Sequence, residues 1–171
     1  MKVDFMRKVD RFIGVPLCYL LSFLNLFFRF FKRKSENRIR KVLFIQISEM
    51  GSAVYVSRAI EELKKNHPSA QICYLMFEEL CGIIGALSMI DNKNLYTIRS
   101  SSLTALIFDT CKAIFKLRRQ KIDVIIDLEL FSRFSSILGY LIGSKELIGF
   151  NRFCMEGLYK GSFQTKRVIY N

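Results

Sequence analysis

Two short polar segments of the chain hold residues that could do chemistry. The first is Ser48-Glu49-Met50-Gly51-Ser52, which directly follows a run rich in β-branched and aromatic residues. Glu49 could act as a general base on a hydroxyl nucleophile if its carboxylate faced a cleft. The alternative is a solvated loop charge, which the spacing alone favours, with Gly51 supplying the positive φ that a tight turn needs.

The second segment runs from Asp127 to Arg133 and brings two acids, a serine and an arginine together: Asp127, Glu129, Ser132 and Arg133. Asp127 ends an apolar run, so we expect it to be partly buried and to need hydrogen-bond donors. A loop-pinning role and a functional role both fit that position. Arg133 could bind a phosphate or carboxylate through two parallel hydrogen bonds, or pair with Glu129 four residues earlier.

Several other chemistries find no support in the sequence. The first segment lacks GxGxxG, and no Gly-Lys-Ser/Thr follows it, so neither common phosphate-binding loop is present. The five cysteines stand singly, and the one histidine, His67, precedes a proline at an expected helix end. Isolated thiols of this kind are typical of small buried side chains in a reducing compartment. We therefore predict no metal site and no resident cofactor.

The elements that must position these residues alternate between strand and helix. Apolar runs predict strands at 41–47, 71–77, 95–99, 122–128 and 145–150, and helical periodicity predicts helices at 53–63, 78–87, 103–120 and 131–142. This order predicts an α/β fold, a Rossmann-like, doubly wound and mainly parallel sheet. The carboxyl ends of parallel strands open on one edge, so the two polar segments should line one groove there.

Residues 1–40 differ in composition from residues 41–171, and we treat them as a separate leader. Residues 12–28 carry no charge, and eleven Lys/Arg against three acids give residues 1–41 a charge of +8, out of +12 for the whole chain. This combination indicates contact with anionic lipid rather than nucleic acid. Three arrangements fit: a membrane span, an interfacial helix, or a helix docked on the domain. The short length and the basic flanks favour the interfacial anchor.

The order of three motifs resembles the amino-terminal half of glycosyltransferase family 9, the ADP-heptose:lipopolysaccharide heptosyltransferases and their relatives. The motifs are Ser-Glu-Met-Gly-Ser after the first strand, Asp-Val-Ile-Ile-Asp-Leu-Glu-Leu-Phe-Ser-Arg-Phe-Ser from residue 123, and Leu-Ile-Gly-Phe from residue 147. The leader around 10–18 and the tail 156–171 resemble a membrane-associated branch of that family.

The resemblance implies a GT-B enzyme in which the amino-terminal domain binds a glycolipid acceptor and the carboxyl-terminal domain binds the nucleotide-sugar donor. Gly51, Asp127, Glu129, Ser132 and Arg133 then become candidates for acceptor binding. The family's catalytic Asp follows the turn glycine, and here that position is Ser52. A serine cannot serve as that base unaided, so Glu49 is the nearest substitute.

The resemblance also predicts that these residues are the acceptor half alone and inactive by themselves. Two origins stay open: a truncated gene product, or one part of an enzyme whose donor domain is a separate polypeptide. The expected location is the cytoplasmic face of the bacterial inner membrane. Two other classes remain open: a membrane-associated interaction module that reuses the fold without catalysis, and a stand-alone nucleotide-binding domain. The missing phosphate loop counts against the second of these.

Overall fold

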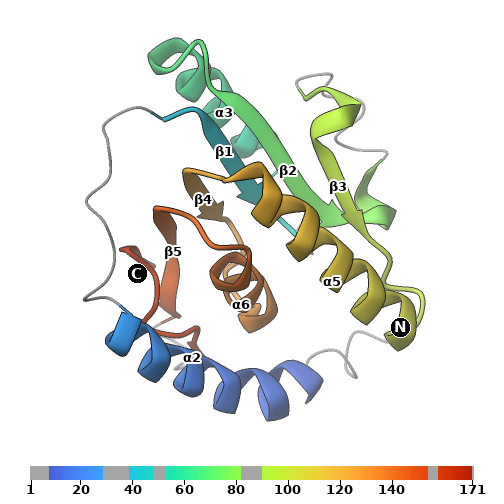
Figure 1. The fold of residues 1–171 in the computed structure, drawn as a ribbon, viewed down its shortest axis with the longest axis vertical. Coiled ribbons are helices and arrows are strands. Elements are labelled where there is room, and N and C mark those ends of the chain that lie inside the picture. The colour runs from blue at the N-terminus through green and yellow to red at the C-terminus, as the bar shows by residue number, and fades with distance from the viewer. Residues whose placement is uncertain (1–7, 29–38, 48–52, 82–89, 154–157, 171) are drawn as a thin grey trace.

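A mainly parallel sheet forms the centre of the molecule. The computed structural model describes residues 8–28, 39–47, 53–81, 90–153 and 158–170. Within these ranges seven strands lie in the order β3-β2-β1-β4-β5-β6, with β7 paired to β5 (Figure 1). Their bounds are β1 Lys41–Ile45, β2 Gln71–Phe77, β3 Leu95–Ile98, β4 Val124–Asp127, β5 Glu146–Phe153, β6 Leu158–Tyr159 and β7 Lys166–Tyr170. The β5–β6 pair is antiparallel and the other pairs are parallel.

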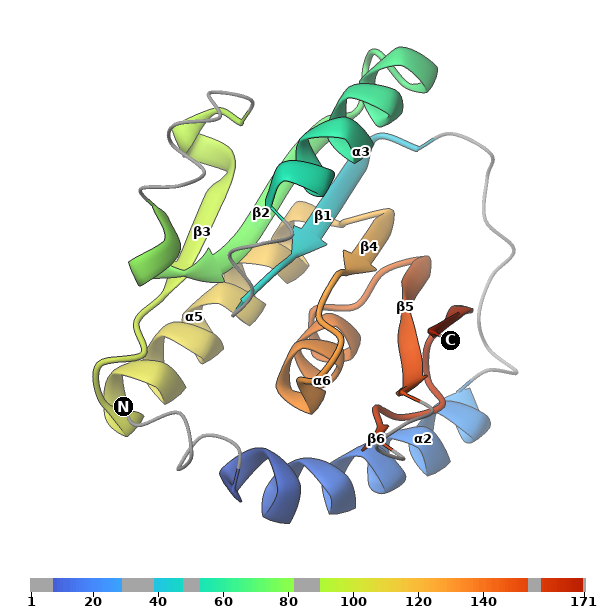
Figure 2. The ribbon, with the colours of Figure 1, turned by 180° about the vertical axis from the view of Figure 1, so that it is seen from behind.

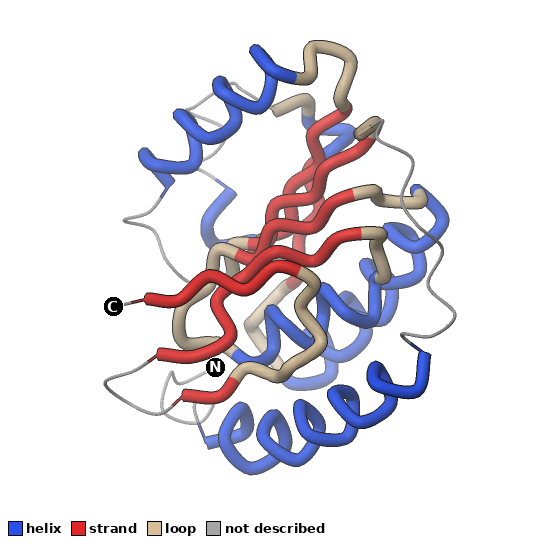
Figure 3. The backbone as a smooth tube through the Cα atoms, turned by 90° about the vertical axis from the view of Figure 1, so that its left-hand side faces the viewer, coloured by secondary structure: helices blue, strands red, loops and turns tan. Residues whose placement is uncertain are grey.

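Helices cover both faces of the sheet (Figure 3). The α-helices are α2 Val15–Phe28, α3 Ala53–Asn66, α5 Leu103–Gln120 and α6 Arg133–Ile142, and shorter turns are η1 Asp10–Gly14, η3 Glu78–Leu80 and η4 Asn92–Asn94. One core holds buried side chains of α2, α5 and α6 against the sheet, and a second holds those of α3 against the opposite face. The α/β architecture predicted from the sequence is therefore confirmed.

Local signals explain where α5 and α6 begin and end. Ser102 caps α5 by accepting a hydrogen bond from Ala105 N at 3.2 Å, and Lys121 closes the helix in the left-handed conformation at φ 54°. Ser132 caps α6 in the same way, accepting from Ser135 N at 3.4 Å. Gly143 follows α6 at φ 77°, which is easiest for a residue without a Cβ.

Some predicted elements differ from those observed. In the predicted helix at 78–87 the structure shows the 3₁₀ turn η3, and residues 82–89 lie outside the described ranges. The predicted strand at 145–150 continues to Phe153, where it pairs with two strands that the sequence did not predict, β6 and β7. β6 is only two residues long and β7 begins with two basic residues, so neither is marked by an apolar run as long as those of the predicted strands.

The helix of the leader is docked on the domain. Figure 2 shows α2 passing beside β6, with η1 at its amino-terminal end. Cys18 and Leu21 of α2 are buried in the core, and Ser22 Oγ lies 3.0 Å from Tyr159 Oη. The stretch Asp10–Phe27 is the one helix in the described ranges that is long and apolar enough to cross a membrane. Only 17% of that stretch is buried, so most of it faces away from the domain.

Candidate functional site

The site lies where the strand order reverses. The chain leaves β1 towards β2 on one side, whereas β4 leads to β5 on the other, and ligands of such sheets bind outside the carboxyl ends of the strands at this point. Ile45 of β1 pairs with Asp127 of β4, and Leu128 N donates to Ile45 O at 3.0 Å. The loops after β1 and β4 therefore start side by side.

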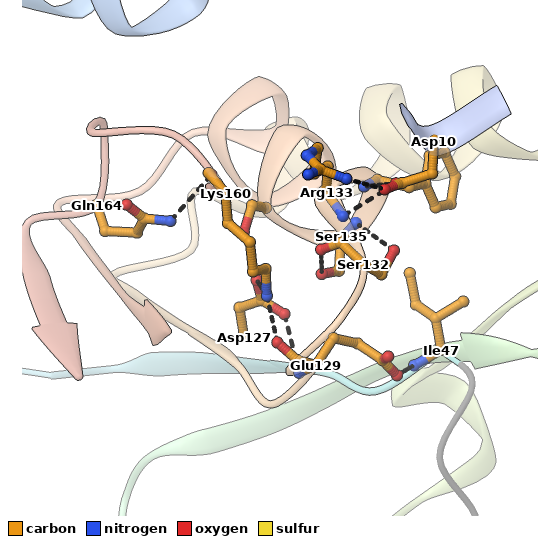
Figure 4. A network of polar contacts seen from close by, with 11 residues as sticks. Asp10, Ile47, Asp127, Glu129, Ser132, Arg133, Ser135, Lys160 and Gln164 are labelled. Atoms are coloured by element: carbon orange, nitrogen blue, oxygen red, sulfur yellow. Dashed lines mark hydrogen bonds and ion pairs between the residues drawn. The ribbon is translucent and has the colours of Figure 1, made fainter. Parts of the chain in front are cut away.

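Asp127 and Lys160 form a buried ion pair at this edge (Figure 4). Their Oδ2 and Nζ atoms are 3.1 Å apart, and both side chains are fully shielded from solvent. Asp127 also accepts hydrogen bonds from Ser136 Oγ at 2.7 Å and from Glu129 N at 3.1 Å. Lys160 Nζ in addition donates to the backbone carbonyl of Glu129. This network pins the loop after β4 to α6 and to the tail.

A glycine allows this pair to form where it does. A Cβ added to Gly149 of β5 would lie 3.0 Å from Asp127 Cβ and 3.6 Å from its Oδ2. A side chain there would require Asp127 to shift by a few tenths of an ångström. The glycine of the Leu-Ile-Gly-Phe motif is thus explained by close packing against Asp127.

Glu129 joins the loops after β4 and β1. Its carboxylate is 1% exposed and accepts a hydrogen bond from Ile47 N at 2.6 Å. Next to it, Tyr74 Oη donates to Gln46 Oε1, and both of these side chains are buried. Burial raises the pKa of Tyr74 well above its ordinary value, and the nearby Glu129 carboxylate adds to the effect. Tyr74 is therefore a neutral hydrogen-bond donor at any ordinary pH.

Arg133 connects the site to the leader. Its Nη1 lies 3.0 Å from Asp10 Oδ2, and its Nε donates to Tyr159 O at 2.9 Å. Asp10 Oδ1 accepts from Arg133 N at 2.9 Å and from Phe134 N at 3.0 Å. Asp10 thus places its charge on the amino terminus of α6, where unpaired N–H groups and the helix dipole favour an anion.

The structure gives Arg133 a different ion-pair partner from the one that the sequence suggested. Within the described residues its ion pair is with Asp10, and not with Glu129 four residues earlier. A Cβ on Gly14 would lie 3.1 Å from Arg133 Cβ, so this glycine permits the close approach of leader and helix. The prediction that Arg133 holds an anionic group of the acceptor stays a prediction.

The remaining site residues are placed only in part. Ser132 is the amino-terminal cap of α6, and its carbonyl accepts from Ser135 Oγ at 2.9 Å. Glu49, Gly51 and Ser52 lie outside the described residues. Their predicted roles in proton transfer and acceptor binding therefore stay predictions, as do those of Asp127, Glu129 and Ser132. The described ranges hold no group of three or more His, Cys, Asp or Glu side chains that could bind a metal ion.

Two residues of this network were not predicted from the sequence. Lys160 lies in the tail between Tyr159 and Gly161, and nothing nearby in the sequence distinguishes it from a solvated lysine. Asp10 carried a weak signal, because it is an acid in a segment where basic residues predominate. An isolated acid at the start of an apolar helix, among cations, is a reason to look for a partner in the fold.

Comparison with known proteins identifies the fold. No protein-family model matches the sequence, and no curated protein matches it. Among solved structures, a glycosyl transferase family 9 protein from Veillonella parvula superposes with a TM-score of 0.63 over 81% of this chain, at 18% identity. The chain has the fold of part of a family 9 glycosyltransferase. E. coli ADP-heptose lps heptosyltransferase II gives a TM-score of 0.60 over 77% of the chain, at 15% identity.

A third structure extends the comparison. E. coli heptosyltransferase WaaC with ADP-2-deoxy-2-fluoro heptose gives a TM-score of 0.59 over 77% of the chain, at 13% identity. The chain spans 38% of the length of the Veillonella protein, 35% of heptosyltransferase II and 42% of WaaC. At such identities the likeness establishes the fold. The resemblance seen in the sequence motifs is confirmed at that level.

Proposed function

We propose that these residues form the acceptor-side domain of a glycosyltransferase that moves a sugar from a nucleotide-sugar donor to a lipopolysaccharide or related glycolipid. The observation that carries the proposal is the polar edge at the topological switch point of a fold shared with heptosyltransferases. Of the three motifs that resemble family 9, one follows β1 in the sequence, the second covers β4 and the residues after it, and the third lies in β5. Such an edge is where a ligand of this kind of sheet binds.

The chemistry that we propose is an inverting transfer. An acceptor hydroxyl attacks the anomeric carbon of the donor sugar, a carboxylate takes the hydroxyl proton, and the nucleoside diphosphate leaves. Glu49 is our candidate for that carboxylate, because Ser52 stands where the family has its Asp. The donor binds the other domain of a GT-B enzyme, and turnover requires both domains because each orients one reactant.

The network behind the loops would hold the site in shape. Asp127, Glu129 and Lys160 are buried and bound to one another, so their effect on the acceptor would act through the loop they position. We keep Arg133, Ser132 and Gly51 as candidates for contact with the acceptor. The partners that we propose are the glycolipid, an anionic membrane surface and a donor domain, at the cytoplasmic face of the bacterial inner membrane.

Reconstitution tests this proposal. The protein is incubated with labelled ADP-heptose and a lipopolysaccharide acceptor, with and without the donor domain of a family 9 enzyme. We expect transfer only when the donor domain is present, and a decrease of about 10²-fold in turnover for Glu49→Gln. Sub-millimolar binding of ADP-sugar by these residues alone would contradict the assignment to the acceptor side.

One observation favours a second candidate, a membrane-associated interaction module without catalysis. Asp127 and Arg133, two of the residues expected at the acceptor, are already engaged by Lys160 and Asp10. A domain that only positions a partner at the membrane needs no free charged side chain for an acceptor, so it could have these residues paired internally. Reconstitution separates the two candidates, because the absence of transfer in the presence of the donor domain would favour the interaction module, whereas unchanged turnover of Glu49→Gln would only remove this residue from the mechanism.

A further inference from the structure

The outward face of α5 combines exposed apolar and basic side chains. Ile107, Phe108 and Phe115 are 56%, 65% and 60% exposed. Phe108 and Phe115 are seven residues apart, so they stand one above the other, two turns apart, on the side opposite the buried Ala113 and Leu117. A surface helix of a soluble domain ordinarily carries polar residues along this stripe.

Basic residues surround this stripe. Lys112, Lys116, Arg118 and Arg119 lie on the second half of α5, and the Arg119 guanidinium lies 4.3 Å from the centre of the Phe115 ring. Asp109 is the only acid in the helix, and it is paired with Arg99 at 2.6 Å. The face therefore presents aromatic side chains bordered by cations, which is the composition of helices that lie in the interface of an anionic membrane.

The position of α5 relative to α2 supports the same reading. Both helices contact α6, which lies between them on one side of the sheet (Figure 1). The outer side of η1 and α2 is also apolar, with Phe12 of η1 and Phe23 and Phe27 of α2 between 61% and 76% exposed. The opposite side of the sheet is covered by α3, which has no large hydrophobic side chain among the exposed residues described.

We propose that the outer face of α5 is a membrane-contact surface, separate from the leader, that lies against anionic lipid. Phe108, Phe115 and Ile107 enter the headgroup boundary while Lys112 and Arg119 bind lipid phosphates. This inference deepens the membrane part of the proposed function. Its test measures lipid contact and not sugar transfer, so failure of either proposal can be told from failure of the other.

Cys111 provides a probe at the right place, because it is exposed between the two phenylalanines. An environment-sensitive fluorophore is attached to it in a protein carrying Cys81→Ser and Cys154→Ser. The matched control is the same protein with Cys111→Ser added, and it carries the fluorophore on α3 through Arg58→Cys. With phosphatidylglycerol vesicles we expect a blue shift and protection from an aqueous quencher at Cys111, and no change at the α3 position.

Substitutions test the two components separately. Phe108→Ser with Phe115→Ser should lower partition onto phosphatidylglycerol vesicles by about tenfold or more, because two aromatic side chains lose their burial in lipid. Lys112→Glu with Arg119→Glu should weaken binding at low salt and have little effect at high salt, where charges are screened. Arg58→Glu with Lys65→Glu, on α3, is the control for charge and should change partition much less.

Two outcomes would overturn the proposal. If the protein sediments with vesicles while the Cys111 fluorophore stays accessible to the quencher, the leader alone makes the contact. If the fluorophore becomes protected without vesicles as protein concentration rises, the α5 face joins two copies of the chain instead.

Discussion

The carboxyl edge of the sheet and the outer face of α2 depart from the usual distribution of residues in opposite directions. At the edge, Lys160 is fully buried and Asp127 is 2% exposed, although lysines and aspartates ordinarily lie at the surface. On this outer side, Phe12 of η1 is 76% exposed and Phe27 of α2 is 68% exposed. The buried charges have partners within the chain, whereas the aromatic side chains are left mostly exposed by the described residues.

The difference shows that the leader has two roles on two sides. Its inner side holds Cys18 and Leu21 in the core and Asp10 on Arg133 at the candidate site. Its outer side is the surface that we assign to the membrane. The leader is therefore part of the structure that supports the site, and changes on its two sides should have different consequences.

Loss of the buried cation should have the largest effect on stability. Lys160→Met leaves the Asp127 carboxylate buried without its counter-charge, so the free energy of unfolding should fall by about 3–5 kcal/mol. Urea denaturation measures the change. Lys166→Ala breaks the exposed pair with Glu146 and should cost less than about 1 kcal/mol.

A double substitution sharpens this test. Lys160→Met combined with Asp127→Asn removes both charges, so a good part of the lost stability should return. A cost below about 1 kcal/mol for Lys160→Met alone would mean that the pair is open to water in solution.

Detachment of the leader should have the next largest effect. Asp10→Ala removes the acceptor for Arg133 and for two backbone N–H groups of α6, at an expected cost of about 2 kcal/mol. Burial of Cys18 raises its pKa to about 11, with Arg133 opposing the shift. The Cys18 thiol should therefore be alkylated more slowly than that of the exposed Cys111. The alkylation rate of Cys18 should rise after Asp10→Ala.

Glu62→Ala is the control for the change of charge, because Glu62 pairs with Lys65 at the surface, far from the leader in the sequence. It should leave the alkylation rate of Cys18 unchanged. If Cys18 reacts as fast as Cys111 in the unaltered protein, then the leader is not docked in solution.

Substitutions on the outer face of α2 should barely change stability. Phe23→Ser with Phe27→Ser should alter the free energy of unfolding by less than about 0.5 kcal/mol, because both side chains are exposed. The fraction of protein that sediments with membranes should nevertheless fall. Leu21→Ser, on the buried side of the same helix, should destabilise the protein and so separates the two sides.

Carbonate washing distinguishes a docked or interfacial helix from a membrane span. We expect the protein to be extracted at high pH, because α2 keeps its contacts with α6 and Tyr159. Retention in the membrane pellet would show that the helix leaves the domain and crosses the bilayer.

The smallest effect on stability should come from the Arg99–Asp109 ion pair at the surface, in contrast to the buried pair of Asp127 and Lys160. The hydrogen bond from Arg99 lowers the pKa of Asp109 from 3.8 to about 2. Because the pKa is lowered by folding, the stabilisation is present above pH 3.8 and is lost as the pH falls through about 2. An NMR titration should show this midpoint, and Arg99→Ala should return it towards 3.8. A midpoint near 3.8 in the unaltered protein would show that the pair does not persist in water.

The sequence by itself determined the local elements and their order. The helix at 103–120 and the strand at 71–77 were predicted with the bounds observed, because apolar periodicity and capping residues such as Ser102 act within a few positions. The alternation of these elements also predicted which loops would share an edge of the sheet. Asp127 was expected to be at least partly buried and to have donors, and it is buried and has them, because it ends an apolar strand.

Only the tertiary structure decided which charges are buried and which residues meet them. Asp10 and Arg133 are 123 positions apart, and Lys160 reaches Asp127 across 33 positions, so no local pattern records either contact. The strands β6 and β7 pair with β5, although β6 is only two residues long and β7 begins with two basic residues, so neither carries a long apolar run of its own. Burial of a lysine or aspartate is tolerated only when an opposite charge is buried next to it, and the whole fold decides whether such a partner lies there.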